Sequence, residues 1–147
     1  MRSLASYVEQ NDALLGVLTV QETIYFSARL RCVFLPFDGP CVTHVRTSSL
    51  DPSTPADVIH RRVEETMRDL GLSDVSQNRI GTPIQRGVSG GQKRRVTIGS
   101  SLVTLPRILF LDEPTSGLDS RTSAEVMSAS KFTYSDLQVP SNTVLYS

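Results

Sequence analysis

The amino-acid sequence predicts an α/β protein that is built on a parallel sheet, and two stretches carry this prediction. The first is the apolar run Ile108–Leu111, which stops at the two carboxylates Asp112 and Glu113. Such a run is typical of a strand buried in a parallel sheet, and open α/β sheets bind ligands at the carboxyl ends of their strands. The second is the Ser-Gly-Gly turn at residues 89–91, which leads into a helical pattern. A glycine turn at a helix start presents N–H groups and a positive dipole end, which suits phosphate.

Composition bounds the class of protein. The chain has 147 residues, a formal net charge of zero and 39% hydrophobic residues, which fits one soluble globular domain or part of one. The balanced charge gives no general case for nucleic acid or an anionic membrane as a partner. The longest apolar runs are only a few residues, so no transmembrane helix is expected. Cys32 and Cys41 lack a metal-binding spacing, and we interpret them as reduced cytosolic thiols.

The first part of the chain predicts a strand end, a polar loop and a helix. The loop at residues 7–12 follows the possible strand end and contains Gln10. By itself, Gln10 is interpreted as an ordinary surface residue. Thr19 and Glu22 have the spacing of a capping box, so a helix is expected to follow and to run to about Arg31.

The middle of the chain predicts an irregular stretch and a second helix. Residues 33–55 hold four of the eight prolines, and a structureless connection of this length is unusual inside a compact domain. We interpret it as a mobile insertion, with a read-through of non-coding sequence as the alternative. A helix then begins with Thr54 as its N-cap and Pro55 at its first position, and Gly71 ends it. Its apolar stripe consists of Val58, Ile59, Val63, Met67 and Leu70.

The last part of the chain predicts two more helices and a strand. One helix starts at about Gly91 and ends before Pro106. We interpret the three consecutive basic residues at 93–95 as its solvated face rather than as a nucleic-acid site. Another helix is expected from Ser120 to about Lys131, and the run at 142–147 is interpreted as the next parallel strand.

Together, these motifs resemble the nucleotide-binding domain of ABC transporters. Residues 88–92 (Val-Ser-Gly-Gly-Gln) resemble the signature loop, 108–113 the Walker B strand with its catalytic glutamate, and 116–119 (Ser-Gly-Leu-Asp) the D-loop. The residues at 86–95 are similar to the corresponding stretch in the G subfamily of pigment, lipid and drug exporters. The loop at 7–12 resembles the Q-loop.

The resemblance implies a fold and its division. The fold is a partial P-loop NTPase, with a RecA-like parallel sheet and the ABC helical subdomain. The helical subdomain is expected at about 19–105 with the irregular insertion at 33–55, and the Walker B and D-loop part of the core at 106–147.

The resemblance also implies ATP and Mg²⁺ as cofactors and assigns the catalytic roles. Asp112 would hold Mg²⁺ through water, because Mg²⁺ keeps several waters. Glu113 would accept or orient the proton of the attacking water. Gln10 would contact both the metal and that water. Adjacent acids on a strand point to opposite faces, which is sensible geometry for these two tasks.

A second set of residues would bind the nucleotide of a neighbouring copy. In ABC dimers the signature loop closes over ATP held by the opposite domain, so Ser89, Gly90, Gly91 and Gln92 are expected to serve the partner's site. Asp119 would lie across the dimer interface. The active unit is therefore expected to be a head-to-tail pair of nucleotide-binding domains.

Two motifs of the family are missing from the sequence. The phosphate loop Gly-x-x-x-x-Gly-Lys-Ser/Thr needs a lysine after a glycine, and neither Lys93 nor Lys131 follows one. No histidine follows Asp119, where the family has its switch histidine. We therefore expect a fragment that is truncated at both ends, binds ATP poorly alone and has marginal stability.

The leading functional prediction is the ATP-binding and ATP-hydrolysing component of an ABC exporter of lipid-like or other apolar substrates. Its expected partners are a second nucleotide-binding domain and a transmembrane domain, not nucleic acid. Its expected location is the cytoplasmic face of a membrane. The chain by itself is expected to be inactive. Two alternatives stay open: a soluble ABC-type ATPase without a membrane domain, and a non-catalytic pseudogene product.

Overall fold

The computed structural model describes residues 5–30, 54–82, 84–106, 108–136 and 143–146. The predicted insertion at 33–55 lies outside the described residues except for its last two positions, so its mobility stays a prediction. None of the described helices is long and apolar enough to cross a membrane. The elements in chain order are β1 (Ala5–Val8), α1 (Val20–Arg29), α2 (Ala56–Asp69), the 3-10 helix η1 (Ser73–Val75), α3 (Gly90–Leu102), β2 (Ile108–Leu111), α4 (Ser120–Asp136) and β3 (Thr143–Tyr146).

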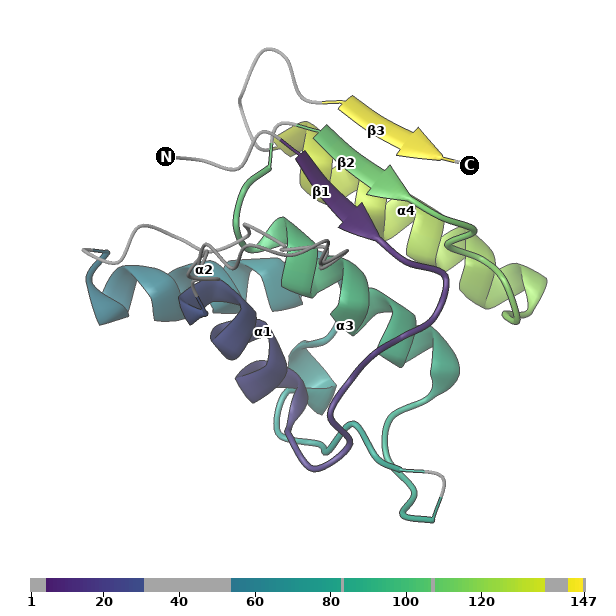
Figure 1. Ribbon diagram of the computed structural model, residues 1–147, viewed down its shortest axis with the longest axis horizontal. Coiled ribbons are helices and arrows are strands. Elements are labelled where there is room, and N and C mark those ends of the chain that lie inside the picture. The colour runs from purple at the N-terminus through teal and green to yellow at the C-terminus, as the bar shows by residue number, and fades with distance from the viewer. Residues whose placement is uncertain (1–4, 31–53, 83, 107, 137–142, 147) are drawn as a thin grey trace, which may run out of the picture.

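The three strands form one parallel sheet in the order β1-β2-β3 (Figure 1). The register pairs Val8 at the end of β1 with Leu111 at the end of β2, and Leu111 with Tyr146 of β3. The carboxyl ends of the strands therefore lie side by side at one edge. This arrangement confirms the predicted α/β class, the strand before Asp112 and the parallel strand near the end of the sequence. The strand before Asp112 is buried only at Leu109 and Leu111, because Phe110 is 37% exposed.

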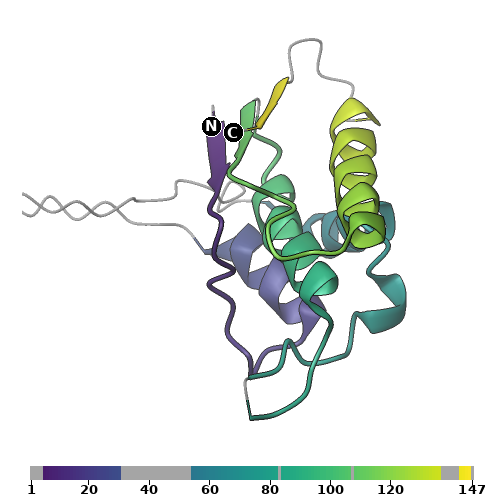
Figure 2. The same cartoon turned by 90° about the vertical axis from the view of Figure 1, so that its right-hand side faces the viewer.

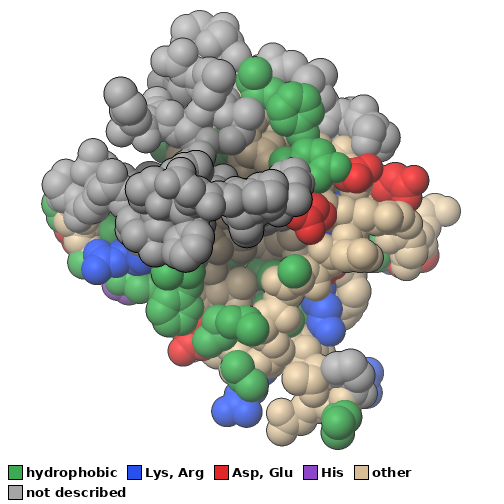
Figure 3. Space-filling view, viewed as in Figure 1, with side chains coloured by type: hydrophobic (Ala, Val, Ile, Leu, Met, Phe, Trp, Pro, Cys, Tyr) green, Lys and Arg blue, Asp and Glu red, His purple; other side chains and the backbone are tan. Residues whose placement is uncertain are grey.

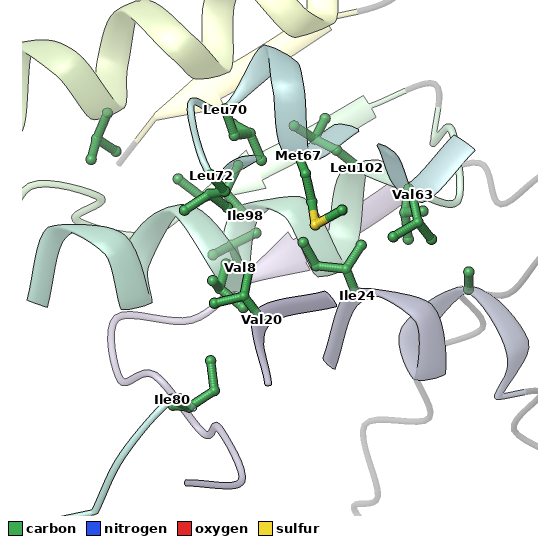
Figure 4. Packing of buried hydrophobic residues seen from close by; sticks show 14 of the residues in the cluster. Val8, Val20, Ile24, Val63, Met67, Leu70, Leu72, Ile80, Ile98 and Leu102 are labelled. Carbon is green, nitrogen blue, oxygen red and sulfur yellow. The ribbon is translucent and has the colours of Figure 1, made fainter. Parts of the chain in front are cut away.

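Helices α3 and α4 lie on one side of the sheet, and α1 and α2 pack against α3 farther from the strands (Figure 2). Buried side chains from β1 and three helices meet between these layers, among them Val8, Ile24, Met67 and Ile98 (Figure 4). Burying an aliphatic side chain of this size stabilises a fold by about 1.5–3 kcal/mol. The cluster therefore holds β1 against the helical layer.

Helix α1 begins at the predicted capping box. The backbone N–H of Glu22 donates to Oγ1 of Thr19 at 3.2 Å, and the backbone N–H of Thr19 donates to Oε2 of Glu22 at 2.8 Å. The hydrogen bonds from Thr19 lower the pKa of Glu22. The helix ends at Arg29, with Leu30 as its C-cap, slightly before the predicted end.

Helix α2 begins one residue later than predicted. Its N-cap is Pro55, which makes no side-chain cap hydrogen bond, and its first residue is Ala56. The prediction of Thr54 as the N-cap was therefore wrong. Pro55 itself occupies the N-cap position, and its ring lies just outside the first turn. The predicted apolar stripe is buried except for Val58, which is 36% exposed.

The end of α2 follows the prediction that Gly71 stops the helix. Gly71 has a φ of 61°, in the left-handed region. The N–H of Leu72 donates to the carbonyl of Met67 at 2.8 Å, and the N–H of Gly71 donates to the carbonyl of Arg68 at 3.0 Å. This pair of hydrogen bonds is the Schellman motif, in which glycine takes the left-handed position without steric cost.

Helix α4 is longer than predicted. It starts at Ser120 as expected but runs to Asp136, past the predicted end near Lys131. The sequence holds no glycine or proline between Lys131 and Pro140. No residue type there breaks a helix, so the helix continues.

The cap of α1 yields a stability prediction. Thr19→Ala removes the hydroxyl that accepts from Glu22, so the free energy of unfolding should fall by about 1 kcal/mol. Thr19→Ser keeps the hydroxyl and should retain most of the stability. Urea unfolding followed by circular dichroism measures both, and equal midpoints for Thr19→Ala and the wild type would contradict the role of the cap.

Candidate functional site

The ends of β1 and β2 bring Gln10 and Glu113 into contact. Gln10 lies two residues beyond Val8, Glu113 lies two residues beyond Leu111, and Val8 and Leu111 are register partners. Nε2 of Gln10 donates to Oε2 of Glu113 at 2.6 Å and to Oγ of Ser116 at 3.4 Å. Because its nitrogen is used on Glu113, the amide oxygen of Gln10 is the atom suited to a metal or a water.

Asp112 lies at the same edge and is held by Tyr7, a residue that the sequence analysis did not single out. The phenol of Tyr7 donates to Oδ2 of Asp112 at 2.6 Å. This hydrogen bond is the main cause that raises the pKa of Tyr7, so the phenol stays protonated at neutral pH. Strand register could have suggested Tyr7, since it lies opposite Phe110 near the paired strand ends. Acidic side chains gather on the visible surface over the segments that follow β1 and β2 (Figure 3).

The backbone at Glu113 corrects the expected geometry of the two acids. They were predicted to point apart because of strand pleating, but β2 ends at Leu111. Glu113 has a φ of 38°, which is uncommon for a residue with a side chain. The N–H of Ser116 donates to the carbonyl of Glu113 at 3.0 Å. A turn after the strand, rather than the pleat, therefore directs Glu113 toward Gln10.

Arg94 corrects the interpretation of residues 93–95 as a solvated face. It is 4% exposed, whereas its neighbours Lys93 and Arg95 are half-buried. Successive helical residues are turned by about 100°, so three in a row cannot share one face. Arg94 lies three and four residues before the buried Thr97 and Ile98, and this spacing is the signal that would have placed it inward. Its guanidinium hydrogen-bonds to the main-chain carbonyls of Glu9, Gln10, Asp112 and Pro114 and to the carboxylate of Asp12.

Residues 89–92 open α3, as the sequence predicted. Ser89 is the N-cap: its Oγ accepts from the N–H of Gln92 at 3.3 Å, and Oε1 of Gln92 accepts from the N–H of Ser89 at 2.8 Å. The side chain of Gln92 thus closes a capping box. The amides of Gly90 and Gly91 are the first two of the helix, which have no acceptor within it and suit an anion. An open pocket of about 530 Å³ lies beside Ser89.

The two glycines of this turn have different surroundings. A Cβ on Gly90 would meet only Cδ2 of Leu118, at 3.9 Å, so Gly90 leaves room for a ligand. Gly91 is buried, and a Cβ there would overlap Cγ2 of Thr122 in α4. Gly91 therefore allows α3 and α4 to pack closely, which is a structural reason for a glycine that was predicted only to bind nucleotide.

Asp119 is exposed and caps α4. Its Oδ2 accepts from the N–H of Thr122 at 3.1 Å, and its Oδ1 accepts from Oγ1 of Thr122 at 2.7 Å. The side-chain and backbone hydrogen bonds from Thr122 lower the pKa of Asp119. Leu118 precedes it beside Gly90, so the turn at 116–119 and the start of α3 are neighbours.

The combination of a strand end with paired acids, a facing glutamine and a Ser-Gly-Gly helix start corresponds to a known family. The family model described as "ABC transporter" matches residues 1–116. The chain belongs to the ABC transporter family. Its matched part contains the stretches that resemble the Q-loop, the signature turn and the Walker B strand end.

Individual relatives place the chain within the nucleotide-binding domains of the G subfamily. It is 41% identical over 123 residues to the "Broad substrate specificity ATP-binding cassette transporter ABCG2" of Rattus norvegicus, which covers 84% of this chain and 16% of that protein. It is 42% identical over 125 residues to "ABC transporter G family member 1" of Petunia hybrida, covering 85% and 17%. It is 40% identical over 147 residues to "ABC transporter G family member 13" of Arabidopsis thaliana, covering 95% and 19%. The chain thus spans less than a fifth of the length of these relatives.

ABC ATPase domains generally use ATP with Mg²⁺, and the donor atoms at this strand end fit such a metal. In the described part of the chain no group of three or more His, Cys, Asp or Glu residues is placed to hold a metal ion. Mg²⁺ in nucleotide sites uses one or two protein carboxylates and takes its other ligands from phosphates and water. The carboxylate of Asp112 and the amide oxygen of Gln10 match that partial set.

The packing of Gly91 in this ABC domain yields a prediction. Gly91→Ala should lower the free energy of unfolding by about 1–3 kcal/mol, because the new methyl group overlaps Thr122. Thr122→Ser removes Cγ2 but keeps the hydroxyl for Asp119, so the double variant should recover most of the loss. Gly90→Ala is the matched control and should be neutral or slightly stabilising. Denaturant unfolding compares the wild type, Gly91→Ala, the double variant and Gly90→Ala. Equal losses of stability in Gly91→Ala and in the double variant would contradict the packing role.

The cap at Asp119 yields a pH prediction. Its pKa is lowered from the ordinary 3.8, so its stabilisation is present above that value and disappears as the pH falls through the lower folded pKa. Asp119→Ala should therefore destabilise the protein at pH 6, and its difference from the wild type should shrink at pH 3. Urea midpoints of Asp119→Ala and the wild type at both pH values measure this. A difference that does not change with pH would contradict the cap.

Proposed function

We propose that this chain carries the hydrolytic strand end and the signature turn of the ATPase domain of a G-type ABC exporter, which moves lipid-like or other apolar substrates across a membrane. The observation that carries the proposal is the hydrogen bond between Gln10 and Glu113, 2.6 Å long, beside Asp112 at paired parallel strand ends. A carboxylate and an amide held together there suit the orientation of a water for attack on a phosphate.

Each residue of this group has a distinct task in the proposal. Glu113 accepts the proton of the attacking water, and Gln10 orients the Glu113 carboxylate while offering its amide oxygen to the metal or the water. Asp112, whose Oδ2 accepts from Tyr7, would hold Mg²⁺ through water. Mg²⁺ held there would supply positive charge against the phosphates of ATP.

The start of α3 serves a second copy of the domain in the proposal. The amides of Gly90 and Gly91, the hydroxyl of Ser89 and the positive end of the α3 dipole bind the phosphate of ATP held by the partner. Lys93 and Arg86 line the adjoining pocket and favour an anion. Gln92 supports this turn through the capping box, and Asp119 lies toward the dimer interface.

The arrangement of partners follows from this assignment. Two nucleotide-binding domains associate head to tail, and a transmembrane domain holds them at the cytoplasmic face of the membrane. Residues 19–105 form the helical subdomain, and residues 106–147 belong to the core. The formal net charge of zero gives no support for a nucleic-acid partner.

A segment exchange tests the proposed reaction. Replacing the matching segment of the rat ABCG2 transporter by this chain should give a protein that hydrolyses ATP with Mg²⁺. In that exchange protein, Glu113→Gln should lower kcat by about 100-fold or more, because the carboxylate no longer accepts a proton. Glu64→Gln, which removes an exposed carboxylate on α2, is the matched control and should leave kcat unchanged.

An ATPase assay of the 147-residue chain by itself provides a second test. Its sequence has no phosphate-loop pattern, so the 147-residue protein is expected to show no turnover. Mg²⁺-dependent hydrolysis by the chain alone, abolished by Glu113→Gln, would contradict this expectation. An inactive exchange protein, or equal activity of Glu113→Gln and Glu64→Gln, would contradict the assignment of the catalytic base.

A further inference from the structure

We propose that Arg94 is a positioning residue: from helix α3 it holds the two backbone segments that carry Gln10 and Glu113, and so sets the geometry of that pair. The catalytic meaning of this inference rests on the proposed function, whereas the positioning itself concerns the structure alone. It also connects the Ser-Gly-Gly turn with the strand ends, because Arg94 lies one helical turn after Gly90.

The guanidinium of Arg94 contacts both segments symmetrically. On the segment after β1, Nη1 donates to the carbonyls of Glu9 at 2.6 Å and Gln10 at 3.1 Å. On the segment after β2, Nη2 donates to the carbonyl of Asp112 at 2.7 Å, and Nε donates to that of Pro114 at 3.2 Å. Asp112 and Pro114 are the two neighbours of Glu113. Arg94 thus binds the backbone on both sides of Glu113 and the backbone of Gln10 itself.

The position suits arginine because it needs many donors in a fixed plane. A guanidinium has five N–H donors in a rigid fork, and a lysine has three around a single point. The Arg94 side chain is 5% exposed, and its charge is balanced by Oδ1 of Asp12 at 3.2 Å. Thr97 fixes that carboxylate by donating its hydroxyl to the same oxygen at 2.8 Å. A buried charge is retained only with such partners.

These contacts hold a backbone that is otherwise unfavourable. Glu113 has a φ of 38°, and a non-glycine residue in the left-handed region persists when the surrounding structure holds it there. The carbonyls bound by Arg94 immediately precede and follow Glu113. Without them, the turn can relax and the Glu113 carboxylate moves away from Gln10. Hydrogen bonds from a charged donor are roughly twice as strong as those between neutral groups, enough to maintain this conformation.

The adjacent Arg95 offers a matched control. It lies on the same helix but faces away from the strand ends: it donates to the carbonyls of Leu70 at 3.2 Å and Gly91 at 3.4 Å, and it lies 3.8 Å from the carboxylate of Glu125. Arg94→Gln and Arg95→Gln therefore make the same chemical change one residue apart, and only the first removes contacts with the Gln10 and Glu113 segments.

The decisive experiment follows the side-chain amide of Gln10 by ¹H–¹⁵N NMR in the 147-residue chain. Gln10→Ala assigns the signal, and Glu113→Ala gives its position when the bond to Glu113 is absent. In Arg94→Gln the signal should move to the position seen in Glu113→Ala, while Arg95→Gln should leave it at the wild-type position. A wild-type signal in Arg94→Gln would overturn the inference.

A second variant covers the case in which Arg94→Gln does not fold. Arg94→Lys keeps the charge but cannot bind four carbonyls, so a folded Arg94→Lys protein should also show the displaced signal, and a wild-type signal there would overturn the inference. Unfolding of both Arg94 variants, with Arg95→Gln folded, would also overturn it, because Arg94 would then serve the whole fold rather than the pair.

Kinetics in the exchange protein separate this inference from the proposed function. Arg94→Gln should lower kcat by about 10-fold or more with the KM for ATP unchanged, because small misplacements of reacting groups are costly. Arg95→Gln should change kcat much less, and equal losses in the two variants would overturn the inference. If the unsubstituted exchange protein hydrolyses no ATP, the proposed function fails, and the NMR comparison still decides the role of Arg94.

Discussion

The parallel pairing of β1 with β2 is the constraint on which the site depends. Because Val8 lies opposite Leu111, residues equally far beyond the two strands must leave the sheet side by side. Gln10 and Glu113 are such residues, and their side chains meet at 2.6 Å although they are 103 positions apart in the sequence. A shift of this register by one residue would turn the strand to its other face and separate them.

The register alone does not determine where the side chains point, because both strands end before the site begins. Arg94 supplies the missing restraint. It is a buried cation whose donors are used on four carbonyls and one carboxylate of the two segments. Since it belongs to α3, the position of the Ser-Gly-Gly turn and the position of the acids are determined by the same helix. A ligand bound at either place would therefore act on one connected structure.

The two glycines at the start of α3 have two different roles, one in ligand approach and one in helix packing. Gly90 leaves open space in which a ligand can approach the helix, whereas Gly91 leaves space for Thr122 of α4. Asp119 holds Thr122 from the other side. The Ser-Gly-Gly turn and the turn at 116–119 are thus packed against each other before any nucleotide or partner is considered.

The sequence by itself predicted most of the helices and strands and the family, because these depend on local signals: the capping box at Thr19, the Ser-Gly-Gly turn at 89–91, Gly71 after α2, and the apolar run before Asp112. Its resemblance to the ABC family also named Gln10, Asp112 and Glu113. Only the tertiary structure decided how they are held. The left-handed turn at Glu113, the contacts of Arg94 with the two strand-end segments and the contact of Tyr7 with Asp112 depend on segments distant in the chain. Local sequence patterns cannot predict such contacts, because the contacts form only once β1, β2 and α3 have packed together.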